Sequence, residues 1–208
     1  CLNLHVSLLP HLRGAVPMPM AILEGLEETG TTLQIMSKGM DEGDIISTRK
    51  IKLDDSETAE SLEKKSAKAS IELLKEDLPK WISGEIKAVP QNHDEATYCY
   101  IADLKKEKAE ITFDTDVQLA ERMTRAFYPW PVAWITISTG AHSGKRLKIF
   151  GVESVKLKDN SGEKEELRMK NEEGNLILCL KNGDLNLKEV QLEGKKRDLA
   201  SNYSYLVD

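Results

Sequence analysis

The sequence is poor in cysteine and has no long apolar run, and each shortage excludes a class of protein. Its three cysteines, Cys1, Cys99 and Cys179, are widely spaced and form no CxxC motif or Cys/His pair. We therefore expect neither a disulfide framework nor a structural zinc site, and we predict no metal. No apolar run approaches the ~20 residues that cross a bilayer, so we expect no membrane partner.

An excess of positive charge is also missing. The chain carries 29 Lys and Arg against 35 Asp and Glu, a net charge of -6, so no global field attracts nucleic acid. RNA contacts would have to come from local patches, because binding to phosphates needs only positioned positive charge. The candidates form two short basic clusters, for which solvated loops are the alternative interpretation: Lys145 and Arg146, then Lys195, Lys196 and Arg197.

The sequence contains enough hydrophobic residues to form a core. Hydrophobic residues make up 40% of the 208 residues, enough for one large or two small domains. Over the first 90 residues, short apolar runs alternate with helical patterns, which is typical of an α/β fold. The pattern predicts strands over 1–5, 31–37 and 45–53, a short helix that begins near Pro17, and a long helix through 62–81.

The periodicity changes after this part of the chain. Gly84, Pro90 and the polar run that follows indicate a linker. Thr115 and Gln118 then have the spacing of a capping box before a helix over 117–127. Short strands separated by Gly-bearing turns follow, with a hairpin signal at Asn182-Gly183, and they are expected over 133–138, 147–156, 166–170, 176–180 and 185–190.

Five or six short strands with one helix predict a small barrel. Trp130 lies between Pro129 and Pro131, directly after the predicted helix. Because an aromatic ring contributes a large packing area, we expect Trp130 to be buried where the helix meets the barrel.

One group of polar residues could carry chemistry. Asn3 and His5 are two residues apart on the first predicted strand, so their side chains leave the same face, about 6 to 7 Å apart. At the carboxyl end of a strand in an open parallel sheet, such a pair marks a ligand site. Asp41 lies in a turn with Gly43, which lets the backbone approach a ligand closely. The alternative is a hydrogen-bonded core histidine with ordinary turn residues.

Together the three residues suit acyl transfer without a protein nucleophile. An amide can donate a hydrogen bond to an oxyanion, an imidazole can handle a proton, and a carboxylate can orient the imidazole. The attacking group would then be an amine of the substrate.

Four stretches resemble the methionyl-tRNA formyltransferase family. NLHVSLLPHLRGAVPMPMAI (3–22) and ETGTTLQIMSKGMDEGDII (28–46) resemble the second half of its catalytic domain. RAFYPWPVAW (125–134) and EGKK (193–196) resemble its C-terminal barrel. The pattern Asn-x-His-x-Ser-Leu-Leu-Pro is common to the wider formyltransferase family, whereas AFYPWP narrows the resemblance to the methionyl-tRNA branch and its nearest relatives.

The resemblance implies an α/β fold with a defined division. A partial, Rossmann-like formyltransferase sheet domain would occupy 1–86, a linker 87–104 and an OB-like β-barrel 105–208. The family's catalytic residues would fall on Asn3, His5 and Asp41. The formyl donor would bind beside a short loop segment made of Ser7, Leu8, Leu9 and Pro10.

The resemblance also implies a reaction. A formyl group would pass from 10-formyltetrahydrofolate to the amino group of methionyl-initiator tRNA, for translation initiation, by a monomeric enzyme of the cytoplasm or of an organellar matrix. We expect a fragment that lacks the N-terminal half of the catalytic domain, is weak or inactive alone, and exposes a strand edge and apolar surface. The alternatives are a related formyltransferase that acts on an amino sugar or folate substrate, and a non-catalytic RNA-binding remnant.

Overall fold

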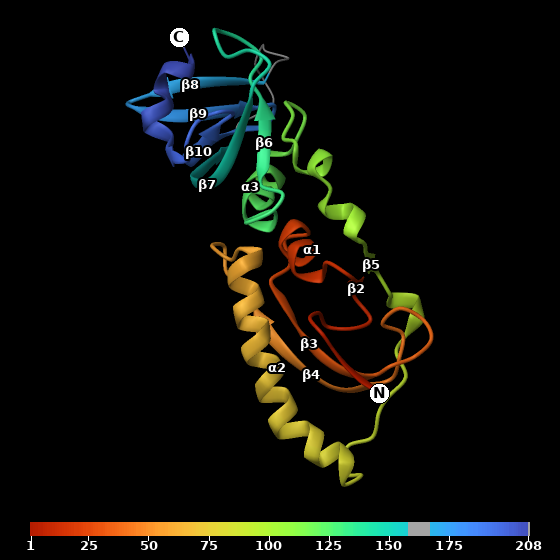
Figure 1. Ribbon diagram of the computed structural model, residues 1–208. Helices are drawn as coiled ribbons and strands as arrows, with labels where there is room; N and C mark the ends of the chain where they lie inside the picture. Colours follow the sequence, from red (N-terminus) through yellow and green to blue (C-terminus); the bar gives the residue numbers. More distant parts are fainter. Residues whose placement is uncertain (158–166, 208) are drawn as a thin grey trace. The chain divides into compact units, whose positions relative to one another are not determined.

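The computed structural model describes residues 1–157 and 167–207. The chain divides into two compact units, Cys1–Leu104 and Lys105–Asp208. The predicted α/β class is confirmed, because helices and sheets are both present (Figure 1).

The first unit is built on a three-stranded antiparallel sheet in the order β1-β3-β4. Its strands are β1 (Leu2–His5), β3 (Glu28–Ile35) and β4 (Ile45–Lys52), and its helices are α1 (Pro17–Leu23) and α2 (Ala59–Ile82). Within the described residues, β1 therefore pairs antiparallel with β3, and not in parallel as expected for a strand of an open parallel sheet. The hairpin from β3 to β4 is too short for the crossover that parallel strands need, and the chain also returns from β1 through α1 in the opposite direction.

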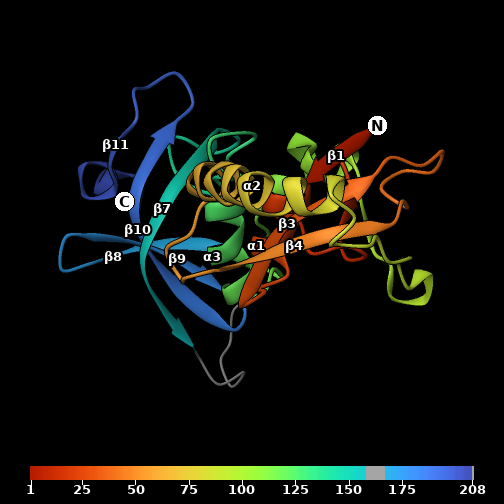
Figure 2. The same cartoon turned by 90° about the horizontal axis from the view of Figure 1, so that it is seen from below.

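The two faces of β1 follow its alternating sequence. Leu2 and Leu4 join an apolar cluster with the buried residues Leu33, Ile46 and Leu73, the last of which is on α2. Helix α2 lies along this apolar face, as Figures 1 and 2 show. The strand's polar residues face the other way, so the predicted site lies on the sheet face opposite α2.

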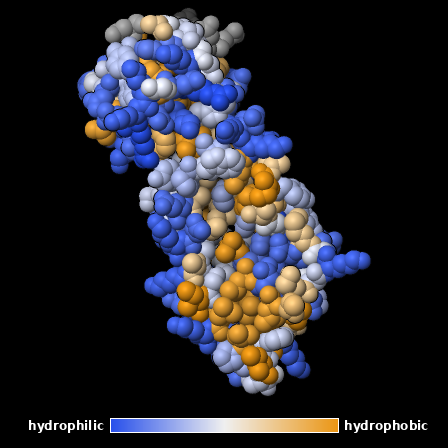
Figure 3. Space-filling view, viewed as in Figure 1, coloured by the Kyte–Doolittle hydropathy of each residue, from blue (hydrophilic) through white to orange (hydrophobic). Residues whose placement is uncertain are grey.

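Strand β1 forms an edge of the sheet. Within the described residues its sheet partner is β3, and β3 separates it from β4. Hydrophobic side chains gather on the surface of the first unit (Figure 3), and partly buried Leu74, Trp81 and Ile86 border the apolar cluster. The unit therefore presents both a strand edge and apolar surface.

The segment 87–104, expected to be a linker, is packed into the first unit. Strand β5 (Tyr98–Cys99) pairs in parallel with β2 (Arg13–Gly14), and Cys99 is fully buried. Short 3-10 helices flank it, η1 (His93–Glu95) and η2 (Ile101–Leu104). A strand of two residues is too short to show alternation, so its pairing leaves no periodic signal in the sequence.

The second unit contains a curled antiparallel sheet. Its 3-10 helices and α-helix are η3 (Lys106–Ala109), α3 (Val117–Ala126) and η4 (Ala200–Val207), and its strands are β6 (Ala133–Thr136), β7 (Arg146–Leu157), β8 (Arg168–Glu172), β9 (Asn175–Leu180), β10 (Gly183–Leu192) and β11 (Asp198–Leu199). The order is β6-β7-β10-β9-β8, with β11 beside β10. The hairpin predicted at Asn182-Gly183 is confirmed by the pairing of Leu180 with Gly183. Residue 166, the first of the strand predicted over 166–170, lies outside the described residues.

The sheet curls toward a barrel without strand pairing between its outer strands in the described part of the chain. Ser138, just after β6, donates through Oγ to the carbonyl of Leu167, just before β8, at 3.0 Å. Residues from both strand ends, together with Leu206 of η4, line a narrow cavity of about 30 Å³. The two outer strands therefore approach each other at one end.

Trp130 is not buried, contrary to expectation: 57% of its surface is exposed. Helix α3 ends at Ala126, and the chain then turns at the surface through the proline-rich segment. Phe127 and Trp134, which flank this turn, are 2% and 8% exposed and supply the core aromatics that Trp130 was expected to provide.

The cap of α3 is Asp116 rather than Thr115. The Asp116 carboxylate accepts hydrogen bonds from the backbone N–H groups of Gln118 and Leu119 at 2.9 and 3.0 Å, whereas Thr115 Oγ1 accepts from the N–H of Thr112. An ionised carboxylate next to two free N–H groups and the positive end of the helix is the stronger cap. These hydrogen bonds, led by that of Leu119, lower the pKa of Asp116.

Replacing Asp116 with alanine is expected to lower the free energy of unfolding by about 1 kcal/mol at neutral pH. Because the pKa of this carboxyl is lower in the folded state than in the unfolded state, its contribution is complete above the unfolded pKa. It disappears as the pH falls through the folded pKa. Urea unfolding of wild type and Asp116→Ala at pH 7, and again well below pH 4, measures the difference; a gap that grows in acid would contradict the assignment, and Thr115→Ala is the control.

Candidate active site

Cross-strand pairing brings two amides to one carboxylate. Asn3 on β1 lies directly opposite Gln34 on β3, so their side chains share the polar face of the sheet. Asn3 Nδ2 donates to Asp41 Oδ1 at 3.2 Å, and Gln34 Nε2 donates to the same oxygen at 2.8 Å. The structure thus brings Asn3 and Asp41 into direct contact across 38 residues of sequence.

The second oxygen of Asp41 is also surrounded by nitrogen atoms. The backbone N–H of Gly14 donates to Oδ2 at 2.9 Å, and Nδ1 of His5 lies 3.5 Å from the same atom. The side chain of Asp41 is 15% exposed. Hydrogen-bond donors from the protein thus take the place of water around Asp41.

One ring nitrogen of His5 is fixed by a hydrogen bond, and the other faces Asp41. The residue is 5% exposed, and its Nε2 lies 2.8 Å from the carbonyl oxygen of Leu12. A carbonyl can only accept, so Nε2 carries the hydrogen in the neutral ring, and Nδ1 directs its lone pair toward Asp41. Of the two side chains, Asp41 is the more exposed, at 15% against 6% for His5.

The loop 36–44, between β3 and β4, places Asp41 over β1. The backbone of Asp41 has a positive φ of 56°, and the N–H of Ile35 bonds the carbonyl of Asp44 at 3.0 Å. A Cβ atom at Gly43 would lie 1.7 Å from the carbonyl oxygen of Ile35. Only glycine therefore lets the loop lie this close to the end of β3, where Asp41 can reach the polar face.

The four residues expected beside the formyl donor divide into two kinds. Ser7 and Leu9 are buried and fasten the loop to β3: Thr32 Oγ1 donates to the carbonyl of Ser7 at 2.7 Å and accepts from the N–H of Leu9 at 3.2 Å. Leu8 and Pro10 are half-buried and alternate with them along the loop. Any contact with a ligand from this segment would therefore come first from Leu8 and Pro10.

Gln34 was not predicted from the sequence as a site residue, although it pairs with Asn3 across the strands and donates a hydrogen bond to Asp41. Gln34 is 2% exposed and shares both the face of Asn3 and its carboxylate partner. A signal was present, because Thr32 and Gln34 put polar side chains at alternate positions of a strand whose other residues include Leu33 and Ile35.

The two basic clusters predicted for RNA meet at one end of the second sheet. Strands β7 and β10 are antiparallel neighbours, and Leu147 at the start of β7 pairs with Leu192 at the end of β10. The stretch beginning at Lys145 therefore lies beside the turn that contains Lys195 and Lys196, although about 50 residues of sequence separate them. The side chains of these three lysines form no ion pair within residues 1–157 and 167–207.

The two arginines of these clusters are already engaged. Arg197 forms a two-pronged ion pair with Glu189, at 2.6 and 2.5 Å, and its guanidinium lies 4.1 Å from the centre of the Phe150 ring. The guanidinium of Arg146 lies 4.5 Å from the centre of the Trp134 ring. Because these guanidinium groups have partners within the fold, the lysines are the better candidates for phosphate contacts.

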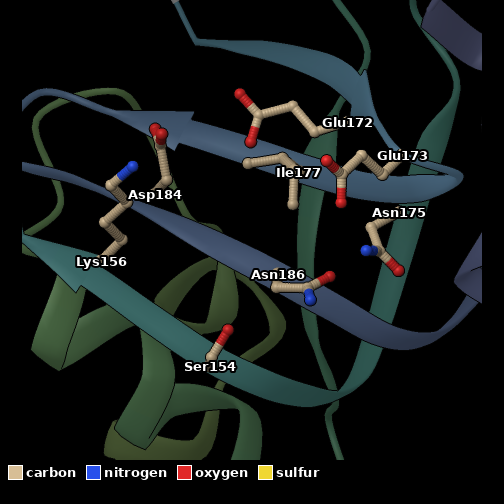
Figure 4. Close-up of a pocket in the computed structure, with 8 residues that line it drawn as sticks. All are labelled: Ser154, Lys156, Glu172, Glu173, Asn175, Ile177, Asp184 and Asn186. Carbon is tan, nitrogen blue, oxygen red and sulfur yellow. The ribbon is translucent and has the colours of Figure 1, made fainter.

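A pocket of about 420 Å³ opens on the second unit, between strands β7, β8, β9 and β10 (Figure 4). Glu172, Glu173 and Asp184 line it with a single lysine, Lys156. Lys170 bridges two of these carboxylates, 2.5 Å from Glu172 and 3.1 Å from Asp184. An acidic lining repels phosphate, so this pocket is not part of the predicted RNA contact.

Two features are absent from the described residues. No group of three or more His, Cys, Asp or Glu side chains among them is arranged to hold a metal ion. No helix among them is both long enough and apolar enough to cross a membrane.

Comparison with protein families accounts for both units. Residues 1–78 match the formyl transferase model, and residues 103–204 match the model of the formyl transferase C-terminal domain. The chain belongs to the formyl transferase family. The family assignment agrees with the resemblance carried by residues 3–46 and 125–134.

Curated relatives of this chain are named methionyl-tRNA formyltransferase. The relative from Methylacidiphilum infernorum is 38% identical over 204 residues, which cover 98% of this chain and 62% of the relative. The relative from Citrifermentans bemidjiense is 36% identical over 197 residues, which cover 95% of this chain and 58% of the relative. The chain thus spans 58 to 62% of the length of these two relatives.

Solved structures with the same fold include other formyl transferases and their relatives. HypX from Aquifex aeolicus, in complex with tetrahydrofolic acid, has a TM-score of 0.66 at 17% identity, covering 97% of this chain and 34% of that one. An N-formyltransferase from Helicobacter canadensis, in complex with folinic acid and dTDP-3-aminofucose, has a TM-score of 0.66 at 20% identity, covering 89% of this chain and 64% of that one. At these identities the likeness shows the fold alone.

Proposed function

We propose that this formyl transferase moves a formyl group from 10-formyltetrahydrofolate to the amino group of methionyl-initiator tRNA, in the cytoplasm or an organellar matrix. The observation that carries the proposal is the contact of Asp41 with both Asn3 and His5. It supports acyl transfer because a carboxylate, an imidazole and an amide donor meet there. The relatives at 34 to 38% identity support the choice of substrate through their names.

The proposed chemistry joins an amine to a formyl carbon. The free amine of the methionyl group attacks the carbon, the bond from carbon to the folate nitrogen breaks, and the proton that the amine loses is returned to that nitrogen. Asn3 uses one amide hydrogen on Asp41, so its second can be donated to the oxyanion that forms. Asp41 accepts the amine proton and shares it with Nδ1 of His5, 3.5 Å away.

The formyl donor is proposed to lie beside the loop 7–10. Two structural neighbours are named as complexes with tetrahydrofolic acid and folinic acid, which supports a folate as the donor. In this chain Leu8 and Pro10 offer apolar surface next to a loop that Ser7 and Leu9 hold in place. A flat pteridine ring suits such a surface.

The experiment that tests the proposal is a formyl-transfer assay with matched acceptors. The chain is assayed alone and joined to the part of the Methylacidiphilum relative that it does not match, with 10-formyltetrahydrofolate as donor and either methionyl-initiator tRNA or a dTDP-amino sugar as acceptor. We expect formyl-methionyl-tRNA from the joined protein and little from the chain alone. Formylation of the sugar alone would contradict the proposed acceptor and support an enzyme that acts on an amino sugar. If neither acceptor is formylated, the alternative of a non-catalytic RNA-binding remnant is favoured.

Reversing the charge of Lys195 and Lys196 together is expected to weaken tRNA binding without slowing chemistry. Each phosphate contact that is lost should reduce the slope of log K against log salt by roughly 0.7 to 0.9. Filter binding at several salt concentrations measures this slope, and kcat at saturating tRNA should stay within about twofold of wild type. In the control, the charges of two exposed lysines of α2, Lys64 and Lys68, are reversed. An equal loss of tRNA binding in the control would contradict a specific contact of Lys195 and Lys196 with tRNA.

A further inference from the structure

A buried arginine lies behind the candidate site, and the proposed chemistry does not use it. Arg13, on β2, is 1% exposed. Two of its nitrogens donate to the same atom, Oε1 of Gln91, with Nε at 3.1 Å and Nη2 at 2.7 Å. The side chain of Gln91 is thereby held in one orientation, because its oxygen must face the guanidinium and its NH2 group must face away.

The NH2 group of Gln91 faces the loop that carries Asp41. Nε2 donates to the carbonyl of Asp41 at 2.8 Å and to the carbonyl of Gly43 at 2.6 Å. Gln91 is 6% exposed, so water does not compete strongly for these bonds. The two carbonyls belong to Asp41 itself and to a residue two positions further along the loop, so one amide holds the backbone that carries Asp41.

The surroundings of Arg13 show that this connection is specific. Nη1 donates to the hydroxyl of Tyr98 at 2.9 Å and lies 4.0 Å from a carboxylate oxygen of Glu42, and Nη2 lies 3.3 Å from Nδ1 of His93. Most of its partners are thus neutral. Burying a guanidinium among neutral acceptors is costly, and such an arrangement is expected where a precise geometry must be kept.

We propose that Gln91, oriented by Arg13, is a positioning residue that holds Asp41 against Asn3 and His5; this rests on the proposed function. The segment 87–104 then contributes to the site through Gln91, although it supplies no group that touches the substrate. The positive φ of Asp41 and the close approach of Gly43 to Ile35 describe a loop that needs such external bonds to stay in place.

The test replaces Gln91 by two residues with opposite consequences for Arg13. Gln91→Glu keeps an acceptor for the guanidinium but removes both hydrogen-bond donors and places a carboxylate against two carbonyls. Gln91→Leu removes the donors and the acceptor together without adding a charge. It therefore shows whether any change seen in Gln91→Glu is due only to the charge of the new carboxylate. The matched control is Asn92→Ala, the next residue, whose side chain is exposed and contacts Glu95 and the N–H of Asp94.

Two measurements separate positioning from general stability. The first is hydrogen exchange at the amide of Gly14, which donates to Asp41 Oδ2 and so reports on that carboxylate without any substrate. We expect about tenfold faster exchange at Gly14 in Gln91→Glu, with strands β3 and β4 still protected. The second is steady-state kinetics on the joined protein, where kcat should fall about 10- to 100-fold while KM for tRNA stays within about twofold.

Each outcome decides the matter. Unchanged exchange at Gly14 in Gln91→Glu overturns the proposal. So does faster exchange throughout the first unit, or an equal effect of Asn92→Ala, because Gln91 would then be merely structural. If the joined wild-type protein formylates no acceptor, the proposed function fails by itself, and the Gly14 amide still shows whether Gln91 holds Asp41.

Discussion

Replacing Asp41 with asparagine is expected to lower kcat/KM for formyl transfer about 100-fold or more, the effect of losing a proton-handling group. The amide oxygen of the new residue can still accept from Asn3 and Gln34. Its NH2 group, however, would face the N–H of Gly14, which donates to Oδ2 in the wild type. One buried donor is left without an acceptor, so the free energy of unfolding should also fall, by about 1 to 3 kcal/mol.

Steady-state kinetics and urea unfolding of Asp41→Asn measure the two effects. The control is Asp44→Asn, the same chemical change three residues further along the loop, at an exposed side chain. Asp44 contributes its backbone carbonyl to the loop, and this group is unaltered by the substitution. Near-wild-type activity of Asp41→Asn, or a loss of equal size in Asp44→Asn, would exclude Asp41 from the chemistry.

Replacing Asn3 with alanine is expected to lower kcat about 100- to 1000-fold, the range found when one oxyanion donor is removed. Asp41 keeps the donors from Gln34 and Gly14, so the carboxylate should stay in place and stability should change little. The loss would therefore appear in kcat and not in the unfolding curve.

Gln34→Ala provides the comparison for Asn3. Both side chains donate to Asp41 Oδ1, but Gln34 is 2% exposed and cannot meet a substrate, whereas Asn3 is partly exposed. Gln34→Ala should therefore reduce the free energy of unfolding more than Asn3→Ala and reduce kcat less. If the two variants lose the same activity, Asn3 acts only by supporting Asp41, and the oxyanion donor must be another group.

Much of the fold was predictable because it follows from local patterns of apolar, polar and turn-forming residues. The alternation of Leu2, Asn3, Leu4 and His5 separates an apolar face from a polar one before any tertiary contact is known. The long helix follows from its apolar spacing, and the hairpin from Asn182-Gly183. The family resemblance and the choice of Asn3, His5 and Asp41 as site candidates also required only the order and identity of residues.

Two predictions that depended on single residues, the cap of α3 and the burial of Trp130, were wrong. Asp116 and Thr115 both suit a helix cap, and only the direction of the backbone N–H groups decides between them. Trp130 satisfies every compositional criterion for burial, yet the core positions around it are filled by Phe127 and Trp134. In both cases neighbouring residues compete for one place, and the competition is settled by geometry that a sequence does not record.

By itself the sequence determined the family, the strand that carries Asn3 and His5, and the residue types of the site. Only the tertiary structure decided that Asp41 receives donors from β1, β3 and the Gly14 backbone, and that Arg13 and Gln91 hold the loop behind it. The reason is physical. Periodicity reports which face of an element is buried, whereas these hydrogen bonds depend on how the elements pack. All but the one from Gln34 join residues 27 to 78 positions apart, and no local pattern encodes them.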